Sequence, residues 1–362
     1  MDANLINTAF QEEIRKKTFS GAQVLLGKGK EQIFGNAYGT VRGDPRSRPI
    51  TALSLFDVAS LTKPFATTFL LMLAVQERVL DLQDPVQKFL PGFRRKERLS
   101  VQQLLEHSSG LPAWLPIFEE LKGQNLSYDQ TVDHYIQRID EAPLLQTPGE
   151  KRIYSDLGFI LLGFILEATH GLRISTSFAN LVVERLALSQ LTFNPLQHPS
   201  LNDIHSIAAT EACPWRGKVL QGEVHDDNAY VLGGAAGHAG LFSNAADLRK
   251  IVLLLLETYA GVETILSKDI LHRFVGADLN FKLGWDTVSP SGSQAGSKFS
   301  EKNSIGHLAF TGCSVWIDFS DQKFVILLTN RVHPSRHEES AFKEFRPRIH
   351  DSLIGEMGKK EP

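Results

Sequence analysis

The spacing of apolar residues predicts strands near both ends of the chain and helices between them. Residues 21–42 alternate apolar runs with turn residues, a pattern typical of a β-hairpin. Residues 61–80 carry apolar positions at helical spacing, and Pro64 lies in the first turn, where a proline costs no helical hydrogen bond. Shorter helical patterns, separated by glycine and proline, follow at 101–106, 128–139, 158–169 and 178–186.

The last third of the chain returns to strand-like patterns after one more helix. That helix is expected over 243–259, with Ser243 or Asn244 as its N-cap. A final helix is expected over about 338–354. Between the two helices lie short apolar runs that are typical of antiparallel strands, at 307–310, 314–319 and 324–330.

These patterns together predict an α+β fold. The N- and C-terminal segments would form one antiparallel sheet flanked by helices, with a mostly helical lobe inserted between them. We expect residues 1–59 and 236–362 to form the sheet domain and residues 60–235 to form the helical lobe.

Composition and charge narrow the classes of protein that fit. The 362 residues are 42% hydrophobic and 22% charged, as in ordinary folded proteins. The net charge of -3 offers no basic field for a phosphate backbone, so no nucleic-acid partner is expected. The longest apolar stretches fall short of the roughly 18 residues that a membrane span needs, so none is expected. Cys213 and Cys313 form no redox-like or metal-like pair.

The chain shows no export signal and no cofactor signature. Glu12, Glu13 and the basic residues after them occupy the place where a signal peptide needs its apolar run. We therefore predict a cytoplasmic location, or a periplasmic one if a leader was removed; the oligomeric state is left open. His225 and His238 stand near carboxylates, but their spacing matches no zinc signature, so neither a metal nor a cofactor is expected.

A candidate nucleophile begins the helical pattern at residue 60. A serine hydroxyl needs a nearby group to take its proton, and Lys63 would stand one helical turn after Ser60 on the same face. The positive end of the helix would also favour a developing negative charge. The same Ser-x-x-Lys spacing begins at Ser320 and Ser340, but those positions fall in an expected turn and on a charged terminal helix. We interpret both as solvated surface.

The surrounding residues resemble a known family. Residues 56–65, Phe-Asp-Val-Ala-Ser-Leu-Thr-Lys-Pro-Phe, resemble the first active-site box of the serine β-lactamase and penicillin-binding-protein superfamily. Four further segments resemble other family segments in the same order, so that the resemblance covers about 50 to 320: 104–112, 148–156, 237–243 and 306–312. It implies a β-lactamase/transpeptidase-like fold and a covalent acyl-enzyme on Ser60.

The resemblance also assigns roles to other residues. It implies that Tyr154 is a second proton-transfer group facing Ser60 and Lys63, and that the backbone N–H groups of Ser60 and Phe310 form the oxyanion hole. A free phenol has a pKa near 10, so Tyr154 would need the Lys63 ammonium to favour its phenolate. Which of Lys63 and Tyr154 takes the serine proton is left open. His107 is expected to fix its loop as a hydrogen-bond donor.

Several positions depart from the penicillin-binding pattern and bear on the substrate. Asp156 replaces a common asparagine; its carboxylate would hold Lys63 charged and repel anionic substrates. His307, Leu308 and Ala309 replace Lys-Thr-Gly on the edge strand. His307 can still offer an N–H or a partial positive charge and Ala309 leaves room for substrate, but Leu308 lacks the hydroxyl that would bind a carboxylate. His238 is expected either to line the cleft or to be structural.

These departures lead to a first hypothesis and two alternatives for the function. We predict a serine hydrolase, esterase-like or amidase-like, acting on a neutral small-molecule or peptide acyl substrate. The first alternative is a peptidoglycan D-alanine peptidase or β-lactamase, and the second is a non-catalytic binding protein of the same fold. No Gly-x-Ser-x-Gly occurs, which argues against an α/β-hydrolase.

Overall fold

One antiparallel sheet joins the two ends of the chain. The computed structural model describes residues 2–96, 98–279, 281–289, 292–337 and 340–357. The sheet has the order β2-β1-β10-β9-β8, and all neighbouring strands are antiparallel. Its members are β1 (Gly21–Lys28), β2 (Glu31–Gly39), β8 (Ser304–Leu308), β9 (Ser314–Asp318) and β10 (Lys323–Thr329). The predicted sheet from N- and C-terminal segments is therefore confirmed.

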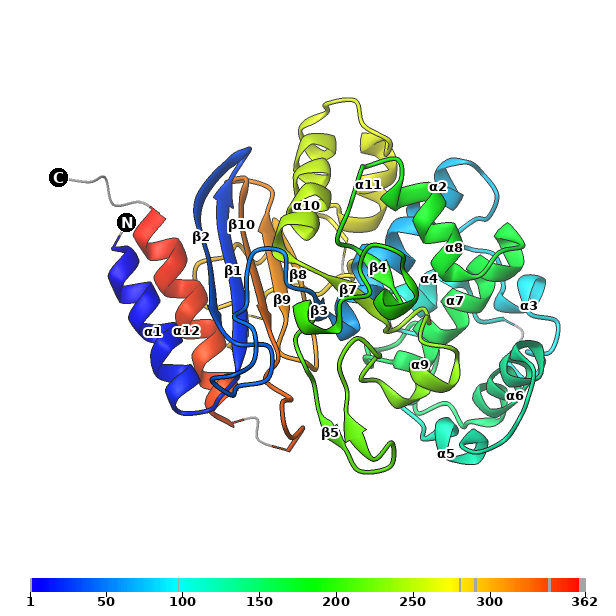
Figure 1. Ribbon diagram of the computed structural model, residues 1–362. Helices are drawn as coiled ribbons and strands as arrows, with labels where there is room; N and C mark the ends of the chain where they lie inside the picture. The colour runs from blue at the N-terminus through cyan, green and yellow to red at the C-terminus, as the bar shows by residue number, and fades with distance from the viewer. Residues whose placement is uncertain (1, 97, 280, 290–291, 338–339, 358–362) are drawn as a thin grey trace.

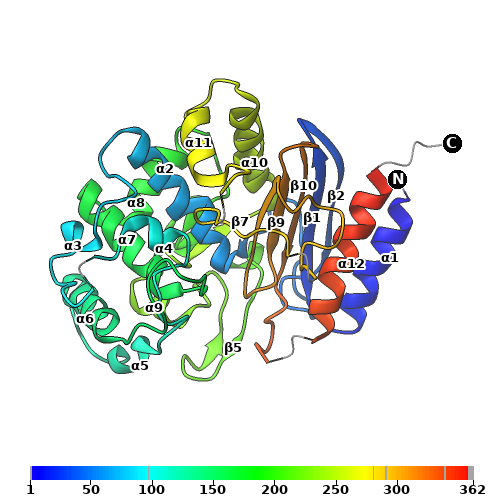
Figure 2. The same ribbon diagram turned by 180° about the vertical axis from the view of Figure 1, so that it is seen from behind.

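Helices cover both faces of this sheet, as Figures 1 and 2 show. α1 (Ala3–Arg15) and α12 (Ser340–Met357) lie side by side on the outer face, and α10 (Ala245–Ala260) lies between the sheet and the helical lobe. Every residue of β10 is buried, since a strand covered on both sides needs apolar residues at successive positions. Positions 338 and 339 of the expected last helix lie outside the described residues.

The outer layer contains a helix that the sequence patterns above do not include. α1 buries Ile6 and Phe10 on one face, and the Asp2 carboxylate caps its first turn. The ring of Phe10 stacks on Tyr38 of β2 with centroids 4.3 Å apart and meets Phe345 of α12 edge-on at 5.3 Å. These aromatic contacts join α1 to both the sheet and α12.

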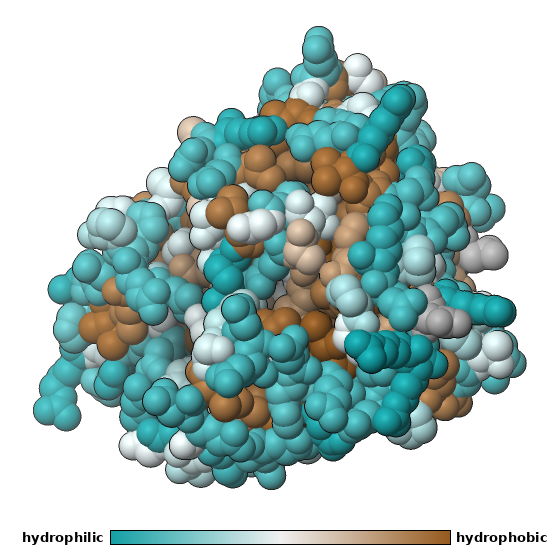
Figure 3. All heavy atoms as spheres, turned by 90° about the vertical axis from the view of Figure 1, so that its right-hand side faces the viewer, coloured by the Kyte–Doolittle hydropathy of each residue, from teal (hydrophilic) through white to brown (hydrophobic). Residues whose placement is uncertain are grey.

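The inserted lobe is mostly helical, as predicted. Its centre is α7 (Asp156–His170), in which residues 157–166 are all buried. Hydrophilic side chains dominate the outside of the lobe, while apolar ones gather towards the recessed centre of that face (Figure 3). The other helices of the lobe are α2 (Phe69–Gln76), α3 (Val86–Phe89), α4 (Val101–Leu105), α5 (Ile117–Leu121), α6 (Tyr128–Glu141), α8 (Ile174–Phe178) and α9 (Asp227–Val231).

The helix expected over 61–80 is shorter and less regular than predicted. It starts as a 3-10 turn, Ala59–Leu61, widens into a π-helical turn, Lys63–Thr68, and becomes α-helical only in α2. It ends at Gln76 because Arg78 adopts a left-handed conformation with φ 58°. Such wide turns are typical of functional sites. The expected helix over 178–186 is likewise divided, into α8 and the π-helical turn Ala179–Val183.

Smaller elements connect the sheet and the lobe. Asn244 caps α10 by accepting a hydrogen bond from Asp247 N–H, which decides between the two expected caps. Both cysteines are free and buried. The proposed boundaries at 59/60 and 235/236 stay a prediction. The remaining elements are β3 (Phe56–Asp57), β4 (Thr192–Phe193), β5 (Ala212–Cys213), β6 (Lys218–Val219), β7 (Leu241–Ser243), α11 (Lys268–Val275) and the 3-10 turns Pro195–Gln197 and Ile204–Ser206.

Within the described ranges, no individual helix has both the length and the apolar composition to cross a membrane. One bent pair, α7 followed by Ile174–Val183 at 73°, passes the length and composition test only when taken together.

Candidate active site

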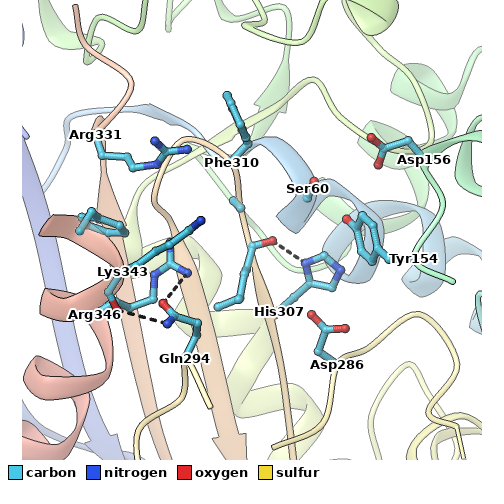
Figure 4. Close-up of a pocket in the computed structure, with 13 residues that line it drawn as sticks. Ser60, Tyr154, Asp156, Asp286, Gln294, His307, Phe310, Arg331, Lys343 and Arg346 are labelled. Carbon is cyan, nitrogen blue, oxygen red and sulfur yellow. Dashed lines mark hydrogen bonds between the residues drawn. The ribbon is translucent and has the colours of Figure 1, made fainter. Parts of the chain in front are cut away.

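A strained bend presents Ser60 at the end of β3. The buried carboxylate of Asp57 accepts hydrogen bonds from the N–H groups of Ala59 at 2.9 Å and His225 at 2.6 Å. These bonds hold Ala59 at φ 44°, a left-handed conformation that a residue with a side chain rarely adopts. The chain therefore turns sharply just before Ser60, whose side chain faces a cleft (Figure 4).

Lys63 is wholly buried directly behind the serine. Its Nζ lies 3.1 Å from Ser60 Oγ, 3.2 Å from the carbonyl oxygen of His238 and 2.7 Å from Asp156 Oδ1. The first two contacts are hydrogen bonds donated by the ammonium, and the third is an ion pair. Burial alone would lower the pKa of Lys63, but Asp156 and then Tyr154 outweigh it and hold that pKa above its usual value. The expected approach of a carboxylate to Lys63 is present, and Lys63 is charged at neutral pH.

Tyr154 completes this group but remains a phenol. It interacts with both Ser60 and Lys63, and Lys63 Nζ lies 4.9 Å from the centroid of its ring. Burial is the largest influence on the pKa of Tyr154 and raises it, Asp156 raises it as well, and Lys63 lowers it; together they bring this pKa to about 12. Lys63 favours the phenolate, as expected, but burial and Asp156 together outweigh the ammonium, so Tyr154 keeps its proton at neutral pH.

Asp156 and Tyr154 are positioned by the start of α7. Ser155 caps this helix by accepting a hydrogen bond from Gly158 N–H at 3.3 Å. The N–H of Ser155 donates to Nδ1 of His107 at 3.0 Å, and the His107 ring lies 4.6 Å from that of Tyr154. His107 therefore fixes this loop as an acceptor. Its predicted role as a donor is wrong, because the chain places the backbone N–H of Ser155, itself a donor, against Nδ1.

The third active-site box, His307–Ala309, lies at the end of β8, the edge strand of the sheet. His307 is buried, its Nδ1 donates to the carbonyl oxygen of Leu308 at 2.8 Å, and its ring lies 5.9 Å from that of Tyr154. Burial is the largest influence on the pKa of His307 and holds it below the ordinary 6.5. The expected partial positive charge on His307 is thus absent at neutral pH, because burial disfavours the imidazolium.

The turn after β8 is tied to the nucleophile. Thr311 Oγ1 donates to the carbonyl oxygen of Asp57 at 2.8 Å, and Ala309 N–H donates to Cys313 at 2.8 Å. This connects the backbone around Phe310 to the segment that presents Ser60, as an oxyanion hole shared by the two residues requires. The ring of Phe310 is 43% exposed beside the cleft.

Ser60 lies between two cavities. The larger, about 460 Å³, is lined by Tyr154, Asp156 and the predicted residues of the third box. The smaller, about 240 Å³, is lined by Asp156, Trp114 and His238. His238 Nε2 lies 2.8 Å from Asp226 Oδ1, an attraction that holds the pKa of the Asp226 carboxyl low despite its burial. His238 thus both lines a cavity and supports Lys63 through its carbonyl oxygen.

Sequence reasoning missed several residues of the larger cavity. Asp286, which accepts a hydrogen bond from Arg152 at 2.8 Å, lies beside His307 (Figure 4). At the far end the cavity is lined by three cations: Arg331, Lys343 and Arg346. Lys343 belongs to the Ser340 motif; it borders the cavity but is exposed, so the interpretation of this motif as solvated surface holds. In the sequence, only the Ser-x-x-Lys spacing drew attention to Lys343. Among the described residues, no three His, Cys, Asp or Glu side chains are grouped to hold a metal ion.

Comparisons with known proteins agree with this architecture. The chain is 32% identical over 346 residues to an N-acetylmuramyl-L-alanine amidase of Bacillus subtilis, covering 87% of this chain and 78% of that protein. Two solved structures, each 21% identical, share the fold over 98% of this chain. One is EstCE1, described as a hydrolase with promiscuous acyltransferase activity, with a TM-score of 0.76 and 98% of its chain covered. The other is the octameric penicillin-binding protein homologue from Pyrococcus abyssi, with a TM-score of 0.75 and 78% covered.

The family described as Beta-lactamase matches residues 6–344, nearly the whole chain. The protein therefore belongs to the β-lactamase family of serine hydrolases.

Proposed function

We propose that this protein hydrolyses ester or amide bonds through an acyl-enzyme on Ser60. The observation that carries the proposal is the contact of Ser60 Oγ with Lys63 Nζ at 3.1 Å, at the edge of a cleft, with Tyr154 beside both. A protein that only binds does not need a lysine held against a serine at the edge of a cleft, so this contact favours catalysis. We therefore set the non-catalytic alternative aside.

Each residue then has a distinct task. Ser60 Oγ attacks the acyl carbon, and the N–H groups of Ser60 and Phe310 stabilise the oxyanion that forms. The Lys63 ammonium stabilises the developing charge on the serine oxygen. Tyr154 transfers the serine proton and later protonates the leaving group, since its phenol contacts Ser60 and borders the larger cavity.

The preferred substrate in this proposal is a neutral ester. Leu308 lines the cleft where a hydroxyl would bind a substrate carboxylate, and Asp156 faces the same space with a negative charge. An anionic group near Ser60 would lose a hydrogen bond and meet repulsion. The fold shared with the hydrolase EstCE1 supports this choice.

A second candidate is an amide of an acidic peptide. Arg331, Lys343 and Arg346 line the far end of the same cleft, where they could attract a carboxylate placed away from the reacting bond. The named activity of the Bacillus subtilis relative, an N-acetylmuramyl-L-alanine amidase, supports this candidate.

Acyl loading on Ser60 tests the proposal and separates its two candidates. The protein is mixed with p-nitrophenyl acetate, an N-acetylmuramyl-L-alanine peptide, a D-alanyl-D-alanine peptide and a cephalosporin, and intact mass is followed with time. Ester turnover should disappear in Ser60→Ala, and should fall by about 10²–10⁴ in Lys63→Ala and Tyr154→Phe. Ser320→Ala, at a Ser-x-x-Lys outside the cleft, is the matched control and should keep full activity.

Two outcomes would contradict the proposal. If Ser60→Ala kept more than a few per cent of the ester activity, another nucleophile would be required. If the muramyl or D-alanyl substrate turned over faster than the ester, the second candidate would replace the first.

A further inference from the structure

Neither residue next to Ser60 has the protonation state of a base. The Lys63 ammonium donates hydrogen bonds to Ser60 Oγ and to the carbonyl oxygen of His238, and it is held charged by an ion pair with the Asp156 carboxylate at 2.7 Å. Tyr154 carries its proton at neutral pH because burial and Asp156 outweigh Lys63 and bring its pKa to about 12. A proton leaving Ser60 therefore needs a further acceptor that is already neutral and lies within reach of this group.

Two histidines flank the Tyr154 ring, and their hydrogen bonds fix different tautomers. His107 Nδ1 accepts from the N–H of Ser155, so in the neutral ring the proton lies on Nε2. His307 Nδ1 donates to the carbonyl oxygen of Leu308, which can only accept. In His307 the other ring nitrogen, Nε2, therefore carries a lone pair and can accept a proton. In His107 the corresponding Nε2 carries a proton and can only donate it.

The lone pair of His307 has no other use within the described part of the chain. His307 is 1% exposed, and its Nε2 is buried without a hydrogen-bond partner there. The ring borders the larger cavity together with Tyr154, and Figure 4 shows the two side by side. A buried nitrogen that gains no hydrogen bond costs stability, so its retention at the reacting group suggests a functional role.

Asp286 is placed to stabilise a proton on His307. Reciprocal backbone hydrogen bonds between Asp286 and Gly306, at 2.8 and 3.0 Å, fix Asp286 beside the residue that precedes His307. Its carboxylate points towards the imidazole in Figure 4 and is held there by Arg152 at 2.8 Å. Asp286 favours the imidazolium, while Lys63 and Arg152 oppose it; Tyr154 and His107 are the other titratable groups facing this cluster.

We propose that His307 is the final proton acceptor during acylation, reached through the hydroxyl of Tyr154. As Ser60 Oγ bonds to the acyl carbon, its proton passes to Tyr154 Oη. The phenol proton passes to His307 Nε2 through a hydrogen bond that forms only when substrate is bound, since the two atoms are not hydrogen-bonded in this structure. The protons then return in the opposite order, so that Tyr154 protonates the leaving group as its bond to the acyl carbon breaks. No net proton is gained or lost, and Lys63 stays an ammonium throughout. This inference rests on the proposed function.

The pH dependence of acylation distinguishes this role from a structural one. We measure kcat/KM for p-nitrophenyl acetate between about pH 4 and about pH 9. Activity should require neutral His307, so the rate should fall with acid through a pKa below 6.5. The plateau rate of His307→Gln should be lower by a factor of about 10²–10⁴, and the fall in rate towards acid pH, called here the acid limb, should be absent. Free imidazole should partly restore His307→Ala.

Three further variants assign the acid limb. Asp286→Asn removes a charge that favours the imidazolium, so its limb should shift to lower pH. His107→Asn should keep the limb even if its rate falls, because His107 offers a donor. His134→Gln, on the surface of α6, is the histidine control and should match the parent protein. The acylation rate measured in mixtures of light and heavy water should vary with the deuterium fraction along a curve, as expected when two protons move in one step, and not along a straight line.

The results of these experiments test the role of His307 and not the proposed acyl-enzyme. Thermal unfolding checks that every variant is folded. If folded His307→Gln kept the parent limb, or lost less than about threefold in rate, His307 would not be the acceptor. Loss of the limb in His107→Asn instead would transfer the role to His107. Because Ser60→Ala tests the acyl-enzyme separately, either result would leave the proposed function standing.

Discussion

Replacement of Asp156 by asparagine should destabilise the fold, because Lys63 would stay buried without its carboxylate. Breaking a buried ion pair costs about 3–5 kcal/mol. The Asp156 side chain is 21% exposed, so water can replace part of the interaction and we expect about 3 kcal/mol. For 362 residues the unfolding entropy is about 0.76 kcal/mol per kelvin, which converts this loss to a fall in Tm of about 4 °C.

The pH dependence of this loss has a definite sign. The folded-state pKa of Lys63 lies above its unfolded value of 10.5, so the pair stabilises the fold below that value and loses its effect as pH rises through the folded pKa. The difference in Tm between the two proteins should therefore be steady from about pH 7 to about pH 10. It should shrink above that range.

Calorimetry with a matched control makes the result interpretable. Asp203→Asn breaks the ion pair with Arg48, whose side chains are 50% and 60% exposed, and should cost at most about 1 kcal/mol. Adding Lys63→Met to Asp156→Asn should recover much of the lost stability, because the buried charge is then gone. Equal Tm losses in Asp156→Asn and Asp203→Asn would refute the view that Asp156 holds Lys63 charged.

Two other predictions concern specificity and packing. Leu308→Thr combined with Asp156→Asn should narrow the preference for a neutral aryl ester over a chromogenic cephalosporin, which we expect to be about 30- to 1000-fold in kcat/KM. An unmodified protein that cleaved the cephalosporin as efficiently would reject the esterase proposal. Gly237→Ala should cost at least about 1–3 kcal/mol in urea unfolding, because its Cβ would stand 2.0 Å from the carbonyl oxygen of Phe159. An unchanged midpoint would show that this loop is not closely packed.

The sequence predicts contacts that depend on local spacing. Ser60 and Lys63 meet because three residues make about one helical turn, and this holds even though the turn is partly 3-10 and π-helical. The terminal strands are predictable because short apolar runs bounded by turn residues are typical of β-strands. α1 could have been inferred from the spacing of Ile6 and Phe10, but its partners Tyr38 and Phe345 come from distant segments.

Properties that depend on several segments at once are beyond such reasoning. The direction of the His107 hydrogen bond is set by where the chain places Ser155, and the neutral state of His307 is set by burial. The phenol of Tyr154 is retained because burial outweighs the nearby ammonium, a balance that no spacing reveals. Lys343 reaches the cleft only because α12 packs against the sheet.

The strand order has a consequence for when a growing chain can become reactive. β1 gains its second neighbour only when β10 has been synthesised, so the first hairpin must wait with one edge unpaired. The same late strands carry Phe310 towards Ser60, which left the ribosome much earlier. A partly made chain thus holds the serine without the edge strand that would support its chemistry. Under the proposed mechanism, a chain would gain hydrolytic activity only once the late strands complete the sheet.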